Sequence, residues 1–161
     1  MKKLLMGVLV TIGMSSAYGD TGSVDKYLSD HKNWQTEPAS LVYLNSRCGA
    51  LNAAVTTRFD GLNDERSIAL RKQYLNTTTY FFEASTLFGS LAAVSDEALN
   101  KRTIYWAKQY ATMMNDNWVK YNDATTGQVG NDLKYCNQKV YPEVTRTVNY
   151  LLKASKKKAS L

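Results

Sequence analysis

Apolar side chains recur at spacings of three and four residues along most of this chain, the period of an α-helix rather than a β-strand. The clearest run predicts a helix from Thr36 to Phe59. Pro38 lies in its first turn, where the missing N–H leaves no hydrogen bond unmade, and Gly61 permits the left-handed backbone that closes it. The apolar stripe of this helix reads Leu41, Leu44, Cys48, Leu51 and Val55.

Two longer helices are predicted next. One begins at Asn63 or Asp64 and continues to Val94, with the stripe Leu70, Tyr74, Thr77, Phe81, Ala84, Phe88 and Leu91. The other has Ser95 as its N-cap and extends to Tyr121. Its stripe reads Ile104, Ala107, Ala111, Met114, Trp118 and Tyr121, and is flanked by Trp106, Tyr110 and Met113. This aromatic content predicts that the helix is the best-buried one of the chain.

The ends of the chain carry one short and one long predicted helix. The short one runs from Val24 to Asn33, and the long one runs from Asn131 to Ala154 with the apolar positions Leu133, Cys136, Val140, Val144, Thr147 or Val148, and Leu151. Pro142 lies inside the long helix and cannot donate to the carbonyl of Gln138. A kink is therefore expected there.

The predicted fold class is all-α. Four long helices joined by short turns favour an up-down-up-down four-helix bundle with a short extra N-terminal helix, tied by one disulfide. The chain has only two prolines and nine glycines, and no alternating strand-like run. Residues 20–155 are enough for one domain with a hydrophobic core and too few for two.

Residues 1–19 have the layout of a cleaved secretory signal. Lys2 and Lys3 precede an apolar stretch from Leu4 to Met14, and cleavage is predicted after Ala17 or after Gly19. An uncleaved membrane anchor is the alternative, but the apolar stretch is shorter than the ~20 residues that span a bilayer. The short, lysine-rich leader indicates a bacterial or phage protein with a periplasmic or secreted location.

Charge is distributed unevenly once the leader is set aside. The full chain has 20 Lys and Arg against 14 Asp and Glu, but two lysines belong to the leader and three form the run Lys156, Lys157 and Lys158. The body from Asp20 to Ser155 therefore has a net charge of only +1, which argues against a nucleic-acid-binding module. The basic tail, residues 156–161, is either a helix end that favours cations or a weak contact for anionic lipid or another polyanion.

The two cysteines lie on the apolar stripes of the first and last long helices, which are neighbours in such a bundle. Because an exported protein meets an oxidising compartment, we predict a Cys48–Cys136 disulfide, worth about 4 kcal/mol in the chain-entropy model. Gly49 would remove a side chain where these helices approach. A redox pair, a zinc site and a nucleophilic thiol are the alternatives, but the cysteines are far apart in the sequence and His31 is the only histidine.

No sequence motif points to catalysis. Glu-x-x-His pairs, a haem-attachment sequence, a phosphate-binding glycine loop and a nucleophile elbow are all missing from the sequence, so no catalytic, metal-binding or cofactor-binding residue is predicted. Residues 103–121 hold more aromatic and methionine side chains than one stripe buries. The surplus predicts either a satellite core cluster or a binding surface drawn from Tyr105, Trp106, Tyr110 and Trp118.

These patterns favour an exported, non-catalytic helical protein that binds another exported protein, as an inhibitor, an immunity-type factor or an assembly accessory. One alternative is a small-ligand carrier or enzyme that uses an aromatic pocket inside the bundle. The other is a structural or membrane-surface component recruited through the lysine tail. The sequence names neither the partner nor the oligomeric state.

Overall fold

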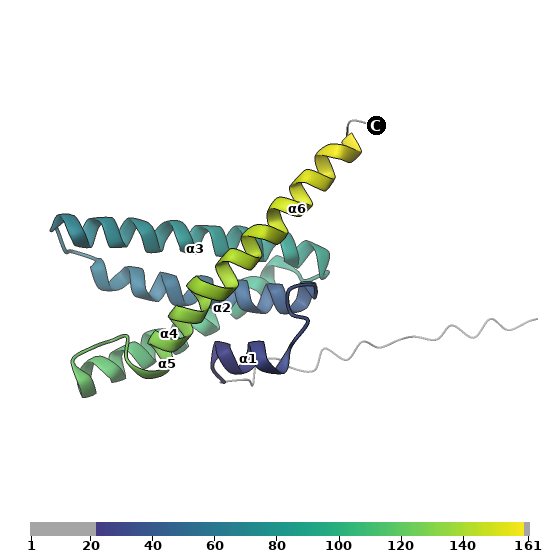
Figure 1. The fold of residues 1–161 in the computed structure, drawn as a ribbon. Helices are drawn as coiled ribbons and strands as arrows, with labels where there is room; N and C mark the ends of the chain where they lie inside the picture. Colours follow the sequence, from purple (N-terminus) through teal and green to yellow (C-terminus); the bar gives the residue numbers. More distant parts are fainter. Residues whose placement is uncertain (1–21, 160–161) are drawn as a thin grey trace, which may run out of the picture.

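The computed structural model describes residues 22–159, with side chains through residue 155. The all-α class is confirmed, since this part of the chain contains helices and no strand. In chain order (Figure 1) the elements are α1 (Val24–Asp30), α2 (Pro38–Thr56), the 3₁₀ turn η1 (Thr57–Phe59), α3 (Glu65–Leu91), α4 (Asp96–Tyr121), α5 (Gly127–Tyr135), the π-helical segment η2 (Cys136–Val140) and α6 (Tyr141–Ala159).

Helix α2 is the centre of the fold. Helices α3 and α4 run beside it, α5 and η2 cover another side, and α6 crosses α2 and α3 obliquely before its last turns extend beyond the other helices (Figure 1). The predicted stripe of α2 is buried from Leu41 to Val55, but so are most positions between its members. The best-buried helix is therefore α2, and the prediction that assigned this property to the helix ending at Tyr121 is wrong.

Local signals fix most helix ends close to the predicted positions. The Asp64 carboxylate accepts a hydrogen bond from Ser67 N at 2.9 Å, and the Ser95 hydroxyl accepts one from Ala98 N at 3.2 Å. Asn122 adopts a left-handed backbone with φ of 53° and ends α4. The Asp64 and Ser95 side chains satisfy N–H groups that a helix leaves unpaired at its start. They therefore fix the starts of α3 and α4 independently of the core.

The buried stripe of α4 differs from the predicted one. Leu99, Trp106, Tyr110 and Met114 are buried, whereas Ile104, Trp118 and Tyr121 are each more than half exposed. Two interleaved apolar stripes exist on this helix, and the sequence does not say which one faces inward. The structure selects the stripe whose tyrosine hydroxyl finds buried polar partners, as a buried tyrosine requires.

Gly49 allows α3 to approach α2. A Cβ atom at this position would lie 2.4 Å from the Phe82 ring and 3.2 Å from Cβ of Phe81. The sequence predicted close approach at this glycine, but between the helices that carry the cysteines. The neighbour is α3 instead, because Gly49 and Cys48 face different sides of α2.

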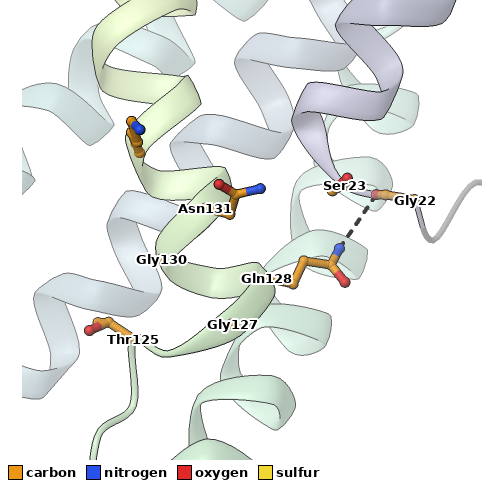
Figure 2. Close-up of a pocket in the computed structure, with 8 residues that line it drawn as sticks. Gly22, Ser23, Thr125, Gly127, Gln128, Gly130 and Asn131 are labelled. Carbon is orange, nitrogen blue, oxygen red and sulfur yellow. Dashed lines mark hydrogen bonds between the residues drawn. The ribbon is translucent and has the colours of Figure 1, made fainter.

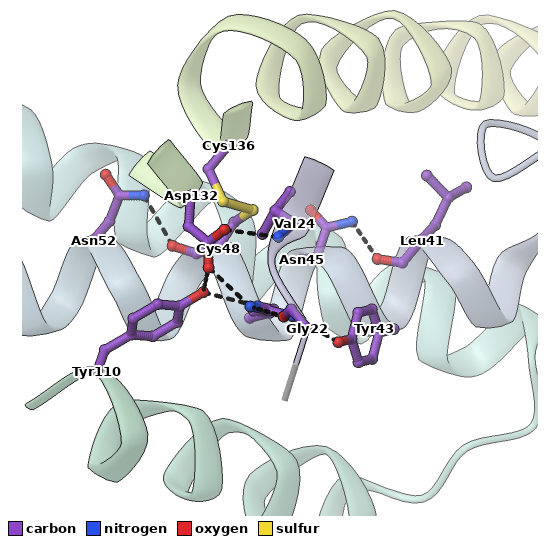
Figure 3. The surroundings of a disulfide bond; sticks show 11 residues. Gly22, Val24, Leu41, Tyr43, Asn45, Cys48, Asn52, Tyr110, Asp132 and Cys136 are labelled. Carbon is purple, nitrogen blue, oxygen red and sulfur yellow. Dashed lines mark hydrogen bonds and ion pairs between the residues drawn. A yellow bond between two sulfur atoms is a disulfide. The ribbon is translucent and has the colours of Figure 1, made fainter. Parts of the chain in front are cut away.

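Figure 3 shows the Cys48–Cys136 disulfide, which confirms the predicted pairing. The bond joins α2 to the start of η2, with Cα atoms 5.5 Å apart. The predicted last helix is divided into α5, η2 and α6, and the π-helical segment ends just before Tyr141 and Pro142. A wider turn there is consistent with the hydrogen bond that proline cannot donate.

The last helical region also begins earlier than predicted, at Gly127 instead of Asn131. The two glycines of this segment resemble loop residues in the sequence, but they let the preceding loop fold against the helix. Gly127 has φ of +59°, and a Cβ at Gly130 would lie 2.2 Å from the carbonyl oxygen of Thr125.

Two predicted features fall outside the described residues: the signal sequence, residues 1–19, and the side chains of Lys156, Lys157 and Lys158. Within the described residues, none of the helices combines the length and apolarity that a bilayer crossing requires.

Removing the disulfide tests its contribution to the fold. We expect Cys48→Ala/Cys136→Ala to lower the free energy of unfolding by about 2–4 kcal/mol, because the unfolded chain regains the entropy that the long loop restricts. Urea unfolding monitored by circular dichroism measures this loss. Equal urea midpoints for the double variant and the oxidised wild type would contradict the assignment.

Candidate functional site

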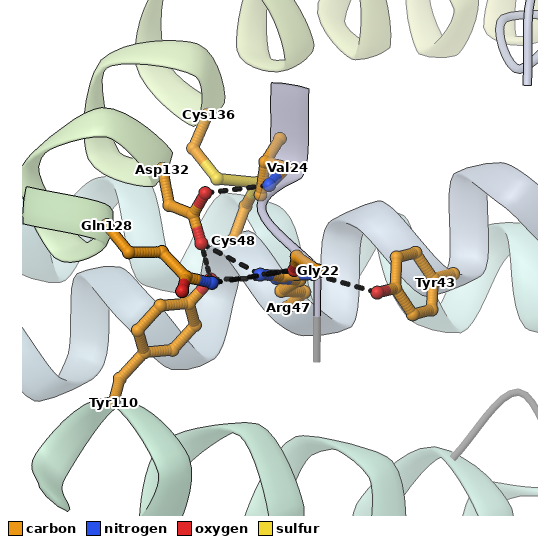
Figure 4. A network of polar contacts seen from close by, with 9 residues as sticks. All are labelled: Gly22, Val24, Tyr43, Arg47, Cys48, Tyr110, Gln128, Asp132 and Cys136. Carbon is orange, nitrogen blue, oxygen red and sulfur yellow. Dashed lines mark hydrogen bonds and ion pairs between the residues drawn. A yellow bond between two sulfur atoms is a disulfide. The ribbon is translucent and has the colours of Figure 1, made fainter. Parts of the chain in front are cut away.

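An ion pair lies in the centre of the fold, between α2 and α5 (Figure 4). Arg47 Nη2 is 2.8 Å from Asp132 Oδ2, and both side chains are fully buried. Arg47 is the only charged residue between Glu37 and Arg58, so α2 carries a single charge at its middle. Burying one charge without a partner is strongly unfavourable, which makes Asp132 its necessary counterpart.

The guanidinium of Arg47 is surrounded by aromatic residues as well as by the carboxylate. Its Nε donates to the hydroxyl of Tyr110 and its Nη1 donates to that of Tyr43, both at 2.8 Å. Its flat face lies over the Trp106 ring, 4.1 Å from the ring centroid. Planar shape and several donors suit arginine to this combined stacking and hydrogen bonding.

The same pair holds the segment that precedes α1. Arg47 Nη2 donates to the carbonyl of Gly22 at 2.6 Å, and Asp132 Oδ1 accepts from Val24 N at 2.7 Å. Val24 N is one of the N–H groups that a helix start leaves free, so Asp132 acts as a cap supplied by α5. We call Arg47, Asp132 and Tyr110, with the backbone of residues 22–24, the clamp.

Tyr110 completes the clamp by accepting from Arg47 and donating its own hydroxyl proton to Asp132 Oδ2 at 2.7 Å. Burial disfavours the phenolate and raises the pKa of Tyr110 well above its usual value, with Arg47 lowering it and Asp132 raising it. For Arg47, burial lowers the pKa, but the neighbouring Tyr110, Tyr43 and Asp132 outweigh it and the net shift is upward. Arg47 is thus charged and Tyr110 neutral at ordinary pH.

The chemistry of the clamp is that of a structural tie. Its donors and acceptors are directed at one another and at the backbone, and its three side chains are fully buried. A general acid or base needs a position where a substrate atom can reach it, and this closed arrangement does not provide one. Arg47 and Asp132 were not predicted as site residues, although a lone arginine in the middle of a long apolar helix is the signal that reveals such a pair.

The four aromatic residues predicted as a binding surface have different positions. Trp106 and Tyr110 lie in the core, with 3% and 0% of their surface exposed, and Tyr105 is half-buried. Trp118 is 54% exposed. Two of the four therefore cannot contribute to an exposed surface, because the clamp draws them inward.

Trp118 has exposed neighbours that the prediction did not include. Val119 is 87% exposed and Tyr121 is 58% exposed, in the last turn of α4. We call Trp118, Val119 and Tyr121 the α4 patch. One turn before the patch, Asn115 accepts a hydrogen bond from Arg58 at 2.6 Å, which places the patch near the C-terminal end of α2.

A polar hollow of about 670 Å³ lies between the start of α5 and the segment before α1 (Figure 2). Gln128 Nε2 approaches the Gly22 carbonyl at 3.5 Å along its wall, and Asn131 and Lys134 also contribute to it. Both of these last side chains are exposed. The hollow lies on the solvent side of the clamp, and its lining is as polar as the rest of a protein surface.

In the part of the chain that the structure describes, no group of three or more histidine, cysteine, aspartate or glutamate side chains is placed to hold a metal ion. No family model, curated protein or solved structure matches this chain.

Breaking the clamp should destabilise the protein strongly. We expect Arg47→Met to lower the free energy of unfolding by about 3–5 kcal/mol, because it leaves the Asp132 carboxylate buried without its cation. The matched control is Arg71→Met, which breaks the half-exposed pair with Asp60 at 2.9 Å and should lose less than about 1 kcal/mol. Chemical denaturation measures both, and equal losses would show that the buried pair is not a stabilising tie.

The double variant Arg47→Met/Asp132→Leu distinguishes the cost of leaving one buried charge unpaired from the cost of losing the pair and its packing. With both charges removed, no uncompensated ion remains, and we expect this variant to be more stable than Arg47→Met. A double variant that is less stable than the single one would instead show that the hydrogen bonds to residues 22–24 dominate.

Tyr110 predicts a specific response to alkaline pH. Because its pKa is raised in the folded protein above the usual value of about 10, its contribution to stability is complete below that pH and is lost as the pH rises further. Tyr110→Phe should therefore show a shallower decline of unfolding free energy above pH ~10 than the wild type. Urea titrations at a series of pH values measure the slope, and equal slopes for Tyr110→Phe and the wild type would contradict this prediction.

Proposed function

We propose that this chain is an exported, non-catalytic protein that binds another exported protein through the α4 patch. The observation that carries the proposal is the solvent exposure of Trp118, Val119 and Tyr121 on a scaffold fixed by a disulfide and a buried ion pair. Tryptophan and tyrosine combine a large apolar area with a polar group, and they are the residues on which binding energy concentrates.

The rigidity of the scaffold supports this proposal. A surface that is already ordered loses little conformational entropy when a partner binds, so more of the contact energy appears as affinity. We take α2, α3, α4 and the combined α5–α6 region as the four long elements of a bundle-like scaffold. On this scaffold the patch is displayed at a helix end, away from the buried clamp.

Export is supported by two features and remains part of the proposal. The leader pattern in residues 1–19 and the disulfide are compatible with a periplasmic or extracellular location. Trp106 and Tyr110 are packed into the core, which disfavours the alternative of an aromatic pocket inside the bundle.

The α4 patch can be tested by comparing two exposed aromatic residues. We expect crosslinking capture with the oxidised protein to recover a partner from the extracellular or envelope fraction of the source cells. Trp118→Ala should weaken binding to that purified partner about tenfold or more, the effect of losing an interface tryptophan. Tyr150→Ala, which removes an exposed aromatic residue on α6, should leave the affinity unchanged.

Two results would contradict the proposal. One is the absence of any partner in the capture experiment, and the other is a partner whose affinity is the same for Trp118→Ala and wild type. Circular dichroism melting of the variants establishes that each is folded before binding is compared.

A further inference from the structure

Helix α6 leaves the body of the protein before it ends. Val144 is fully buried, and Val148 and Leu151 are half-buried, so these three residues form the face that packs on the core. Beyond them the helix continues to Ala159, and its last turns extend away from the other helices (Figure 1). The C-terminal part of an amphipathic helix is thus displayed without a covering element in the described structure.

Apolar side chains are exposed where α6 leaves the body. Tyr150 is 72% exposed, Leu152 is 52% exposed, and Leu91 at the end of α3 is 56% exposed. A groove of about 480 Å³ separates Leu91 from Tyr150, and its other walls include Leu41 and Phe88. We call Leu91, Tyr150 and Leu152 the α6 patch.

The charge of the chain changes sharply at this helix. Residues 20–146 contain fourteen lysines and arginines and fourteen acids, and Arg146 pairs with Glu143 at 3.0 Å. Residues 147–161 contain no acid and four lysines, at positions 153, 156, 157 and 158. Residues 20–146 thus have no net charge, whereas all the charged side chains of residues 147–161 are cationic.

The lysine at position 153 lies opposite the packed face. At 100° per residue, Lys153 is about 180° from Val144, whereas Tyr150 and Leu152 lie on either side of the packed face. A helix with an apolar face and a lysine on the opposite face, at low overall hydrophobicity, is typical of helices that lie in the boundary between water and lipid. If the apolar residues of α6 served only to pack on the core, they would stop at the last residue that contacts the core.

We propose that the C-terminal part of α6 docks on an anionic lipid surface. The exposed apolar side chains Tyr150, Leu152 and Leu91 enter the headgroup boundary, and the lysines contact lipid phosphates. Both contributions are required, because few apolar residues are exposed and four cations alone give only weak, salt-sensitive attraction.

Charge argues for lipid over a second copy of the chain. A symmetric dimer through the α6 patch would bring together the same surface of two subunits, and with it two helix ends whose sequence is cationic. An anionic membrane presents the complementary charge over a continuous plane.

This docking surface is separate from the α4 patch. Pro38, at the start of α2, lines the groove of the α6 patch, whereas the α4 patch lies near Arg58, just beyond the other end of α2. The two surfaces are therefore about 28 Å apart along α2, given its 19 residues and a rise of ~1.5 Å each. Lipid docking through the α6 patch and protein binding through the α4 patch can therefore fail independently of each other.

Vesicle co-sedimentation tests the lipid surface. The oxidised chain lacking the leader is mixed with vesicles of pure phosphatidylcholine or of phosphatidylcholine enriched in phosphatidylglycerol. We expect at least tenfold stronger partitioning to the phosphatidylglycerol vesicles. Raising the salt from about 0.1 M to about 1 M shortens the Debye length from about 10 Å to about 3 Å and should abolish most of this preference.

Matched variants separate the two contributions. Replacing the lysines at 153, 156, 157 and 158 with glutamine should remove the preference for phosphatidylglycerol. The control quadruple variant should keep this preference. It neutralises four lysines elsewhere on the protein that are exposed, namely Lys72, Lys108, Lys134 and Lys139. Tyr150→Ser/Leu152→Ser should weaken partitioning about tenfold, and Trp118→Ala, which alters the α4 patch, should leave it unchanged.

Three outcomes would overturn the proposal. They are equal partitioning to both kinds of vesicle, equal loss in the two quadruple variants, and concentration-dependent dimers that disappear in Tyr150→Ser/Leu152→Ser. The last would show that the α6 patch binds a second copy of the chain. Melting curves establish that each variant is folded before its partitioning is compared.

Discussion

The fold depends on one constraint, the need to neutralise a charge buried in the middle of α2. Arg47 has no route to solvent, so Asp132 must reach it from α5, and this contact fixes α5 against α2. Cys48 follows Arg47 in the sequence, and Cys136 lies one turn after Asp132. The ion pair and the disulfide therefore tie the same two segments side by side, one by charge and one by a covalent bond.

The same pair also determines which face of α4 is buried. Trp106 stacks on the guanidinium and Tyr110 bridges the two charges, so the helix is turned to bring both inward. Three side chains of the predicted stripe, Ile104, Trp118 and Tyr121, are left facing solvent. The exposed α4 patch is thus a consequence of the buried clamp, and a change in the clamp would alter the surface that is offered to a partner.

The sequence predicted the features that depend on local signals or on period. The N-cap at Ser95 and the pairing of Cys48 with Cys136 follow from residue chemistry at single positions, and the structure confirms them. The orientation of α4 could not be predicted in this way, since both of its stripes are apolar. The choice depends on a contact between Arg47 and Tyr110, which are 63 positions apart. Such long-range polar contacts leave no periodic trace.

Because the clamp binds backbone groups of Gly22 and Val24, the segment just after the predicted leader is part of the core. The clamp contacts the backbone carbonyl of Gly22 and the backbone N–H of Val24, and nearly every residue type has both groups. The clamp therefore constrains the path of the backbone here more than the identity of the side chains. With the N-terminal segment, α2, α4 and α5 all joined at one buried point, the scaffold is rigid at its centre. The exposed ends of α4 and α6 can then contact partners without any rearrangement of the core.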